Sequence, residues 1–266
     1  MTSPLLVKPH GTHGRVLHVT PASARWTYVG FDLYRLRPGD RVAAETLDRE
    51  ACLVLVEGKA HIRAGGLDFG TVGERASPFD GAPHAVYVPA GSDWSAVAEG
   101  EATLAVCTAP GIRGARPPRH IRPGGIAQEA RGKGSNLRHV ANILPETEPA
   151  DSLLVVEVVT PAGNTSSYPP HKHDVDNIPE ESLLEETYYH RLRPSQGFAF
   201  QRVYTDDRSL DEAMAVENGD VTLVPRGYHP CATVHGYDLY YLNVMAGPVR
   251  AWRFHNAAEH EWLLRA

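Results

Sequence analysis

Cysteine is scarce in this chain of 266 residues, and its placement excludes a disulfide framework. The three cysteines, Cys52, Cys107 and Cys231, are far apart, odd in number and absent from any C-x-x-C pair. Disulfide-stapled domains and structural zinc knuckles are built from closely spaced cysteine sets. We therefore expect three free thiols, mostly buried, in a reducing cytoplasm.

Long apolar runs and an excess of positive charge are also lacking. No segment approaches the roughly 18 uninterrupted apolar residues of a membrane span. The first ten residues lack the apolar core of a signal peptide. The net charge is −6, which offers no general surface for nucleic acid. We expect a cytoplasmic protein with neither a membrane nor a nucleic acid as partner.

Helical periodicity is nearly absent, and short apolar runs between turn residues replace it. The 24 glycines and 21 prolines are spread evenly, which is typical of a barrel or sandwich of many short strands. Only 183–186 and 209–216 could hold a turn or two of helix, the second with Ser209 as its N-cap. The expected strands include Trp26–Leu36, Ala51–Val56, Ala85–Val88, Ala102–Thr108, Leu153–Thr160, Thr187–Arg193, Phe198–Thr205, Asp220–Val224 and Leu239–Met245.

A weak internal repeat predicts two similar halves. In the first half, a strand ends in the Pro-x-Gly turn of Tyr87-Val-Pro-Ala-Gly-Ser-Asp-Trp94. The second half ends a strand in the same way, with Leu223-Val-Pro-Arg-Gly-Tyr-His229. The first half therefore carries Asp93-Trp94 where the second carries Tyr228-His229, so the scaffold repeats and the chemistry does not.

Residues 109–137 differ from both halves, because they are basic and rich in glycine and proline. We interpret them as the connection between domains, whose positive charge is either solvated or contacts a neighbouring domain or subunit. The Gly132–Ser135 stretch lacks the glycine spacing of a phosphate-binding loop. The predicted domains are residues 1–120 and 121–266.

His171-Lys172-His173 is the first motif that carries chemistry. Side chains alternate between the two faces of a strand, so both imidazoles point the same way and Lys172 points away. A second strand-like segment, Leu184-Glu-Glu-Thr-Tyr-Tyr-His190, would place Glu186, Tyr188 and His190 on one face.

The third motif is Pro-Arg-Gly-Tyr-His, residues 225–229, in which a turn at a strand end presents His229. An H-x-H pair, a later Glu and a distant P-x-G-x-H resemble the metal-binding pattern of the cupin superfamily. Three imidazoles and a carboxylate suit zinc, iron, manganese or nickel with open positions for substrate. One departure is a long gap between the histidine pair and the glutamates, which we interpret as a loop and which leaves Glu185 and Glu186 both as candidates. The first half has no H-x-H and resembles a cupin without a metal site.

The resemblance to one family extends over nearly the whole chain. It is carried by five strings, which are Ser166-Ser-Tyr-Pro-Pro-His-Lys-His-Asp174, Leu184–His190, Gly197-Phe-Ala-Phe-Gln-Arg-Val-Tyr-Thr-Asp-Asp207, Val224-Pro-Arg-Gly-Tyr-His-Pro230 and Gly236–Pro248. These strings resemble the 5-deoxy-glucuronate isomerases, which are bicupins of myo-inositol breakdown. The resemblance implies an all-β fold of two β-sandwich or jelly-roll barrels of the cupin type.

The family resemblance also implies a reaction and a ligand set. The reaction is an aldose–ketose shift from 5-deoxy-D-glucuronate to 5-dehydro-2-deoxy-D-gluconate. The implied ligands of one divalent metal, zinc first and manganese, iron or nickel as alternatives, are His171, His173, Glu186 and His229. Two other readings stay open: another metal-dependent cupin enzyme, such as a uronate ketol-isomerase or a dioxygenase, and a non-catalytic bicupin that binds a sugar acid. Analogy of fold predicts a homo-oligomer.

Isomerisation of a sugar acid needs groups that move protons and a cation that holds the carboxylate. Tyr188 and His190 are candidates for the first task if the face of Glu186 points inward, and Tyr241, from the late strand, is another. For the second task we expect Arg202, because it lies mid-strand and is costly to bury without an anion. Arg226, in the turn before His229, and Lys172 are weaker candidates for the same task.

Overall fold

The computed structural model describes residues 3–265, and its chain divides into two compact units. The first comprises the segment that ends at Lys8, Glu129–Val140 and the described residues from Glu157 onward, and we call it the C-terminal unit. The second comprises Pro9–Gln128 and Ala141–Val156, and we call it the N-terminal unit. The units are thus interleaved along the sequence, and the boundary between residues 120 and 121 stays a prediction. Within residues 3–265, no helix has the length and apolar character needed to cross a membrane.

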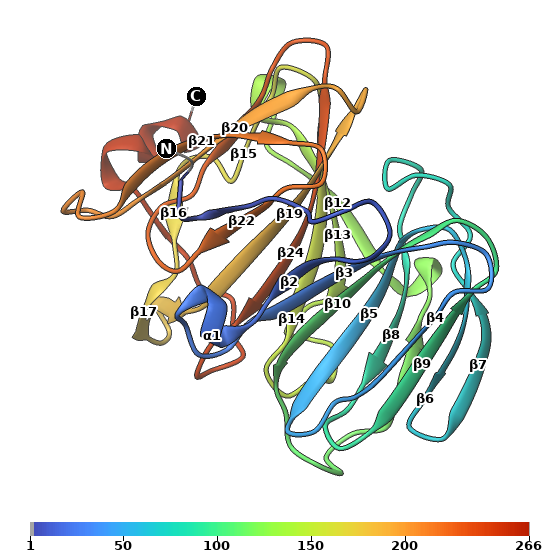
Figure 1. The fold of residues 1–266 in the computed structure, drawn as a ribbon. Coiled ribbons are helices and arrows are strands. Elements are labelled where there is room, and N and C mark those ends of the chain that lie inside the picture. Colours follow the sequence, from blue (N-terminus) through green and yellow to red (C-terminus); the bar gives the residue numbers. More distant parts are fainter. Residues whose placement is uncertain (1–2, 266) are drawn as a thin grey trace. The chain divides into compact units, whose positions relative to one another are not determined.

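Two antiparallel sheets form the N-terminal unit (Figure 1). The six-stranded sheet has the order β11-β8-β5-β10-β3-β2 and the four-stranded sheet the order β4-β9-β6-β7. Their bounds are β2 Gly14–Val19, β3 Gly30–Leu36, β4 Arg41–Glu45, β5 Arg49–Glu57, β6 Ala60–Ala64, β7 Leu67–Val72, β8 His84–Val88, β9 Asp93–Ala98, β10 Ala102–Pro110 and β11 Arg119–Ile121, with a short helix α1 at Pro21–Ala24 and a 3-10 turn at Pro123–Gly125.

Alternate residues of both sheets build the core of the N-terminal unit. Leu53 and Leu55 of β5 lie in one buried cluster with Ile62 of β6 and Trp94 of β9. Burying each such side chain contributes about 1.5–3 kcal/mol. The period-two alternation of the sequence therefore produces a sandwich whose core lies between the sheets.

The C-terminal unit contributes to a seven-stranded sheet of order β1-β22-β19-β24-β14-β13-β12 and contains a four-stranded sheet of order β15-β23-β20-β21 (Figure 1). The boundaries between the units fall within β13 and β14. The bounds are β1 Leu6–Val7, β12 Ala127–Arg131, β13 Arg138–Leu144, β14 Leu154–Thr160, β15 Thr165–Ser166, β19 Glu185–Arg193, β20 Phe198–Tyr204, β21 Asp211–Glu217, β22 Val221–Val224, β23 Cys231–Thr233 and β24 Asp238–Ala246. Short pairs are β16 His171–Lys172 with β25 His255–Asn256 and β17 Asp174–Asn177 with β18 Glu181–Leu183, and 3-10 turns cover Gly134–Asn136 and Ala258–Leu264.

Two local expectations are wrong. The stretch 209–216 is not helical, because 211–217 forms β21, in which Met214 and Val216 alternate inward between exposed neighbours. Residues 183–186 are not helical either, because Leu183 ends β18 and Glu185 begins β19. The expected loop after the histidine pair contains the β17–β18 hairpin, in which the Glu181 carboxylate accepts the backbone N–H of Asp174 at 2.8 Å. The three cysteines are free and buried, as expected.

Candidate metal centre and its cavity

Three imidazoles from separate segments of the C-terminal unit meet at one point. His171 lies on β16, His173 directly before β17, and His229 two residues before β23. One ring nitrogen of each lies within 4.8 Å of the others. His173 and His229 are buried, whereas His171 is partly exposed and forms part of a cavity wall.

Glu186 on β19 joins this triad. Its Oε2 atom lies 3.1 Å from Nε2 of His173 and 3.3 Å from Nε2 of His229. The carboxylate is almost fully buried. The structure therefore brings Glu186 to the imidazoles, whereas Glu185 is the preceding residue of the same strand and faces the other side of the sheet.

The turn at residues 225–229 places His229. Gly227 has a φ of +90°, which favours glycine, and a Cβ atom there would collide with the backbone carbonyl of Tyr204. Its N–H donates to Oδ2 of Asp174 at 2.8 Å, and Tyr228 exchanges backbone hydrogen bonds with Tyr204. The turn is therefore fixed on both sides of the imidazole.

Backbone carbonyls set the tautomers of two imidazoles. Nδ1 of His173 lies 3.0 Å from the carbonyl oxygen of Leu184, and Nδ1 of His229 lies 2.8 Å from that of Gly227. Only a protonated Nδ1 can donate to a carbonyl, so both rings present Nε2 to the triad. Histidine ligands of metals are oriented in this way by an acceptor behind the ring.

The pKa values of the three imidazoles are shifted in different directions. Burial and the neighbouring imidazoles hold the pKa of His171 well below its usual range. Burial also lowers the pKa of His229 to about 4. Burial opposes protonation of His173 too, but the hydrogen bond and charge of Glu186 outweigh it and raise the pKa of His173.

These residues fit a divalent metal ion. The buried Nε2 atom of His229 points toward the other two imidazoles and has no hydrogen-bond partner. Neutral imidazoles and a carboxylate are the donor set of borderline metals such as zinc. A bound cation would give the orphaned Nε2 atom a partner and would replace the proton between His173 and Glu186.

Tyr188, His190 and Tyr241 form one buried aromatic cluster beside the triad. The ring of Tyr188 lies 5.8 Å from that of His229 and 4.8 Å from that of Tyr241. Tyr188 bonds Ser167 at 3.0 Å, and Tyr241 bonds Ser166 at 2.6 Å. Burial raises the pKa of both phenols, so both hydroxyls carry their protons at neutral pH.

His190 is the member of the aromatic cluster that lies cross-strand from Tyr241. Its Nε2 atom lies 3.0 Å from Oε1 of Gln201 and 3.2 Å from Oγ1 of Thr222. Burial lowers the pKa of His190 to about 4, so the ring is neutral at pH 7.

The expectation that Arg202 is buried is wrong. Gln201 is the inward neighbour on β20, so Arg202 points outward, where its guanidinium pairs with Asp211 at 2.7 Å. Arg226 is also exposed. Lys172 points away from the triad, as the strand alternation predicts, and its ammonium pairs with Asp174 at 3.0 Å.

A cavity of about 1270 Å³ opens on His171 within the C-terminal unit. One part of its wall is apolar and includes Trp252, Phe254 and Leu263. Another part is the segment 131–138, which includes Arg131, Lys133 and Arg138. The sequence pattern of most of this segment indicates only a connection between domains, and Arg138 is not among the candidates that the motifs identify. The basic character of the segment was the only signal of a binding role in the sequence. The segment is far from the H-x-H motif in sequence, so its place beside His171 in the cavity wall could not be recognised.

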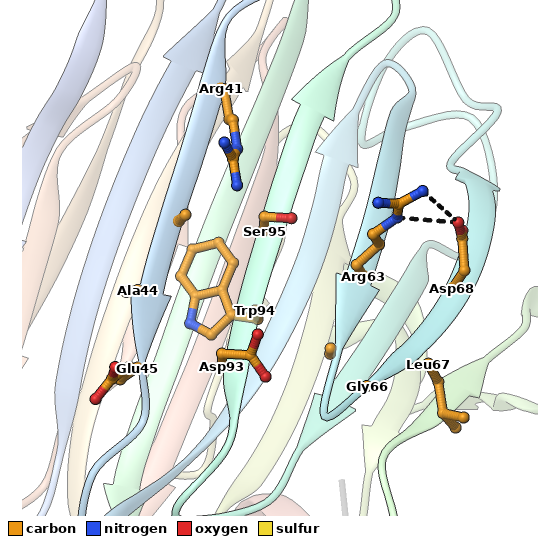
Figure 2. A pocket seen from close by; sticks show the side chains of 12 residues that line it. Arg41, Ala44, Glu45, Arg63, Gly66, Leu67, Asp68, Asp93, Trp94 and Ser95 are labelled. Atoms are coloured by element: carbon orange, nitrogen blue, oxygen red, sulfur yellow. Dashed lines mark hydrogen bonds and ion pairs between the residues drawn. The ribbon is translucent and has the colours of Figure 1, made fainter.

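The N-terminal unit carries a different hollow, on its four-stranded sheet (Figure 2). Its lining includes charged side chains of both signs, and Arg63 binds Asp68 there at 3.0 Å (Figure 2). Trp94 of β9 is part of the lining of this hollow and is 5% exposed. The absence of a metal site from this unit stays a prediction.

Known proteins are similar to this chain over nearly its whole length. The protein named 5-deoxy-glucuronate isomerase from Geobacillus kaustophilus (strain HTA426) is 54% identical over 267 residues, which cover 99% of this chain and 96% of that protein. The protein of the same name from Geobacillus thermodenitrificans (strain NG80-2) is 55% identical over 254 residues, with 95% and 92% covered.

Solved structures identify the fold of this chain. The crystal structure of an IolB-like protein from Salmonella typhimurium LT2 matches with a TM-score of 0.96 at 52% identity and covers 98% of this chain and 99% of that one. The oxalate decarboxylase of Lactobacillus farciminis matches with a TM-score of 0.68 at 14% identity, with 100% and 91% covered, and shares the fold alone. The predicted all-β fold of the cupin type is thus confirmed. The KduI/IolB family model matches residues 5–263, and this chain therefore belongs to the KduI/IolB family.

Proposed function

We propose that this protein converts 5-deoxy-glucuronate into 5-dehydro-2-deoxy-gluconate with one divalent metal ion held by His171, His173, Glu186 and His229. The observation that carries the proposal is the meeting of three imidazoles and a buried carboxylate at the wall of a large cavity. The two Geobacillus relatives, which are 54% and 55% identical to this chain, are named for that substrate. Zinc is the first choice of metal for this donor set, with manganese, iron and nickel as alternatives.

The reaction needs no external oxidant. The aldehyde carbon is reduced to a primary alcohol, the neighbouring hydroxyl-bearing carbon is oxidised to a ketone, and the hydrogen count does not change. A divalent ion, when bound, supplies Lewis acidity toward the two oxygens of these carbons. The protein must exclude water from the reacting end and hold or move the protons.

Tyr188 and Tyr241 are the groups best placed to handle protons. Both hydroxyls are buried beside the triad and protonated at neutral pH, so each can donate a hydrogen bond to an oxygen on which negative charge develops. Hydrogen bonds with the hydroxyls of Ser166 and Ser167 hold the two phenols in position. We assign His190 to the same cluster as a neutral group that orients the ring of Tyr241 across the strand pair.

The first test is turnover of 5-deoxy-glucuronate by the purified protein before and after chelation. We expect isomerisation that disappears on chelation and returns with one added metal, as measured by the appearance of the ketose. Oxygen consumption in place of ketose formation would contradict the proposal and would favour a dioxygenase. Tight binding without turnover would favour a sugar-acid-binding protein.

The second test separates the two neighbouring glutamates. We expect Glu186→Gln to lower the affinity for the metal at least tenfold, because the substitution removes the only carboxylate that contacts His173 and His229 in the described part of the chain. Metal content after dialysis measures this loss. Glu185→Gln is the matched control on the same strand. A variant pair in which Glu185→Gln lost the metal and Glu186→Gln kept it would overturn the ligand assignment.

A further inference from the structure

Arg138 is a partly buried cation in the cavity that contains His171. Its Nη1 atom donates to the carbonyl oxygen of Asn136 at 3.1 Å, and among residues 3–265 no carboxylate pairs with it. A guanidinium has five N–H donors, so most of its capacity is unused. Taking a cation out of water without an anionic partner is costly, and such positions are typical of sites that bind an anion.

Other cations near this region already have partners. Arg131 pairs with Glu129 at 2.6 Å and lies over the ring of Trp252. Arg202 and Lys172 are held by aspartates outside the cavity. Of the two partly buried arginines in the cavity wall, Arg131 has a carboxylate partner, whereas Arg138 has none among residues 3–265.

The backbone that carries Arg138 is held in place. The side-chain amide of Asn164 donates to the carbonyl oxygen of Leu137 at 2.9 Å and to that of Gly134 at 3.3 Å. The amide of Asn136 donates to the carbonyl oxygen of Tyr168 at 2.9 Å. These bonds join the segment to the stretch that leads into His171, so the guanidinium and the triad have a fixed relation.

Arg138 and His171 line the same cavity, so a ligand bound there has the guanidinium and one imidazole of the triad in its wall. A ligand with an anionic end and a carbonyl end, only a few carbons apart, can therefore contact both the guanidinium and the triad.

We propose that Arg138 binds the carboxylate of the sugar-acid substrate in a bidentate manner and so determines the specificity for uronates over neutral aldoses. This inference rests on the proposed function and adds the residue that recognises the end of the substrate that does not react. A planar guanidinium matches the two oxygens of a carboxylate, and such charge-assisted pairs are stronger than neutral hydrogen bonds. With one end held, the aldehyde end is directed to His171.

The test compares Arg138→Ala with Lys133→Ala, which removes an equal charge from an exposed position of the same cavity. Both variants are loaded with metal, and their kcat and KM are measured with 5-deoxy-glucuronate and with 5-deoxy-glucose, which lacks the carboxylate. We expect Arg138→Ala to lower kcat/KM for the uronate roughly 100-fold, mainly through KM, and to leave the neutral sugar unchanged. Lys133→Ala should change kcat/KM less than about threefold, an effect that salt removes.

Two further readouts separate recognition from a structural role. Guanidinium ion added to Arg138→Ala should restore part of the lost activity toward the uronate, which it cannot do for a variant with a distorted fold. Calorimetric binding of 5-deoxy-glucuronate to the metal-loaded proteins tests the anchor even if turnover fails. Binding to the original chain without turnover would overturn the proposed function alone. An equal loss of kcat/KM with both sugars in Arg138→Ala would overturn the assignment of Arg138 as the carboxylate-binding residue. Equal uronate binding by the original chain and Arg138→Ala, or no uronate binding at all, would overturn it too.

Discussion

Buried polar side chains in this protein fall into two kinds. Some have every atom satisfied and serve stability, whereas others, which include His229 of the triad, leave one atom without a hydrogen-bond partner. Glu50 is the clearest member of the first kind, because its two oxygens accept three backbone N–H groups and the hydroxyl of Tyr87. His229 is the clearest member of the second kind. The distinction predicts opposite consequences of substitution.

Glu50→Gln should destabilise the N-terminal unit strongly. The amide group would turn two donor hydrogens toward groups that are themselves donors, at the buried site formed with residues 151–153. We expect a loss of about 3 kcal/mol or more in the free energy of unfolding, measured with denaturant. Glu101→Gln makes the same change at an exposed position and should cost less than about 0.5 kcal/mol. Equal stability of the two variants would refute the role of Glu50.

His190 should make the metal-free protein sensitive to acid. Burial lowers its pKa from 6.5 to about 4 in the folded chain, so the unfolded chain takes up the proton first. The stability that a neutral His190 contributes is therefore complete above pH 6.5 and is lost as the pH falls toward 4. A difference of this size corresponds to about 3 kcal/mol.

Thermal unfolding of chelated protein between pH 4 and pH 7 measures this loss. His190→Gln cannot titrate, so its stability should fall less steeply over that range than that of the original chain. His139→Gln, an exposed site, serves as the control and should leave the slope unchanged. A His190→Gln variant with the same slope as the original chain would contradict the assignment.

At the scale of elements, the turn before His229 links a backbone conformation to the metal centre. Gly227→Ala places a Cβ atom against the carbonyl of Tyr204 at a φ of +90°. We expect a loss of about 2 kcal/mol or more in unfolding free energy and at least a tenfold loss of metal affinity. Gly163→Ala has a similar φ of +78° and open space around it, so it should cost about 1 kcal/mol and leave metal binding intact. Metal titration and denaturant unfolding of both variants decide the question.

The alternation of side chains along each strand was predictable from the sequence, but which of the two faces points inward was not. The spacing of Glu186, Tyr188 and His190 correctly predicted a shared face of β19, because side chains alternate on any strand. The same alternation on β20 could not tell which face is inward, and Arg202 is on the outer one. The stretch at 209–216 was short and mixed, so its period of two could not be distinguished from a helical turn.

The position of Arg138 could not be predicted for a different reason. It follows a glycine-rich basic segment whose local pattern indicates only a connection. Its place beside His171 depends on long-range hydrogen bonds from Asn164, which leave no signature in sequence spacing. Motifs therefore identified the histidines and the glutamate that the folded chain brings together, whereas the rest of the cavity wall became visible only in the folded chain.

At the scale of the whole molecule, the two compact units do not follow a single cut in the sequence. Residues 141–156 belong to the N-terminal unit although they follow the basic segment, and they supply the three N–H groups that bind Glu50. A fragment of residues 1–120, which follows the predicted boundary, leaves this buried carboxylate without those donors. A fragment of residues 1–156 retains them.

We therefore expect residues 1–156 to unfold in a cooperative thermal transition and residues 1–120 to show none. Circular dichroism at increasing temperature compares the two, and Glu50→Gln in the longer fragment links the difference to the carboxylate. This substitution should lower the transition midpoint by several degrees, since about 1 kcal/mol corresponds to roughly 2–8 °C in domains of this size range. A cooperative transition of equal midpoint in residues 1–120 would show that the segment 141–156 is dispensable. It would also support the boundary that the sequence predicts.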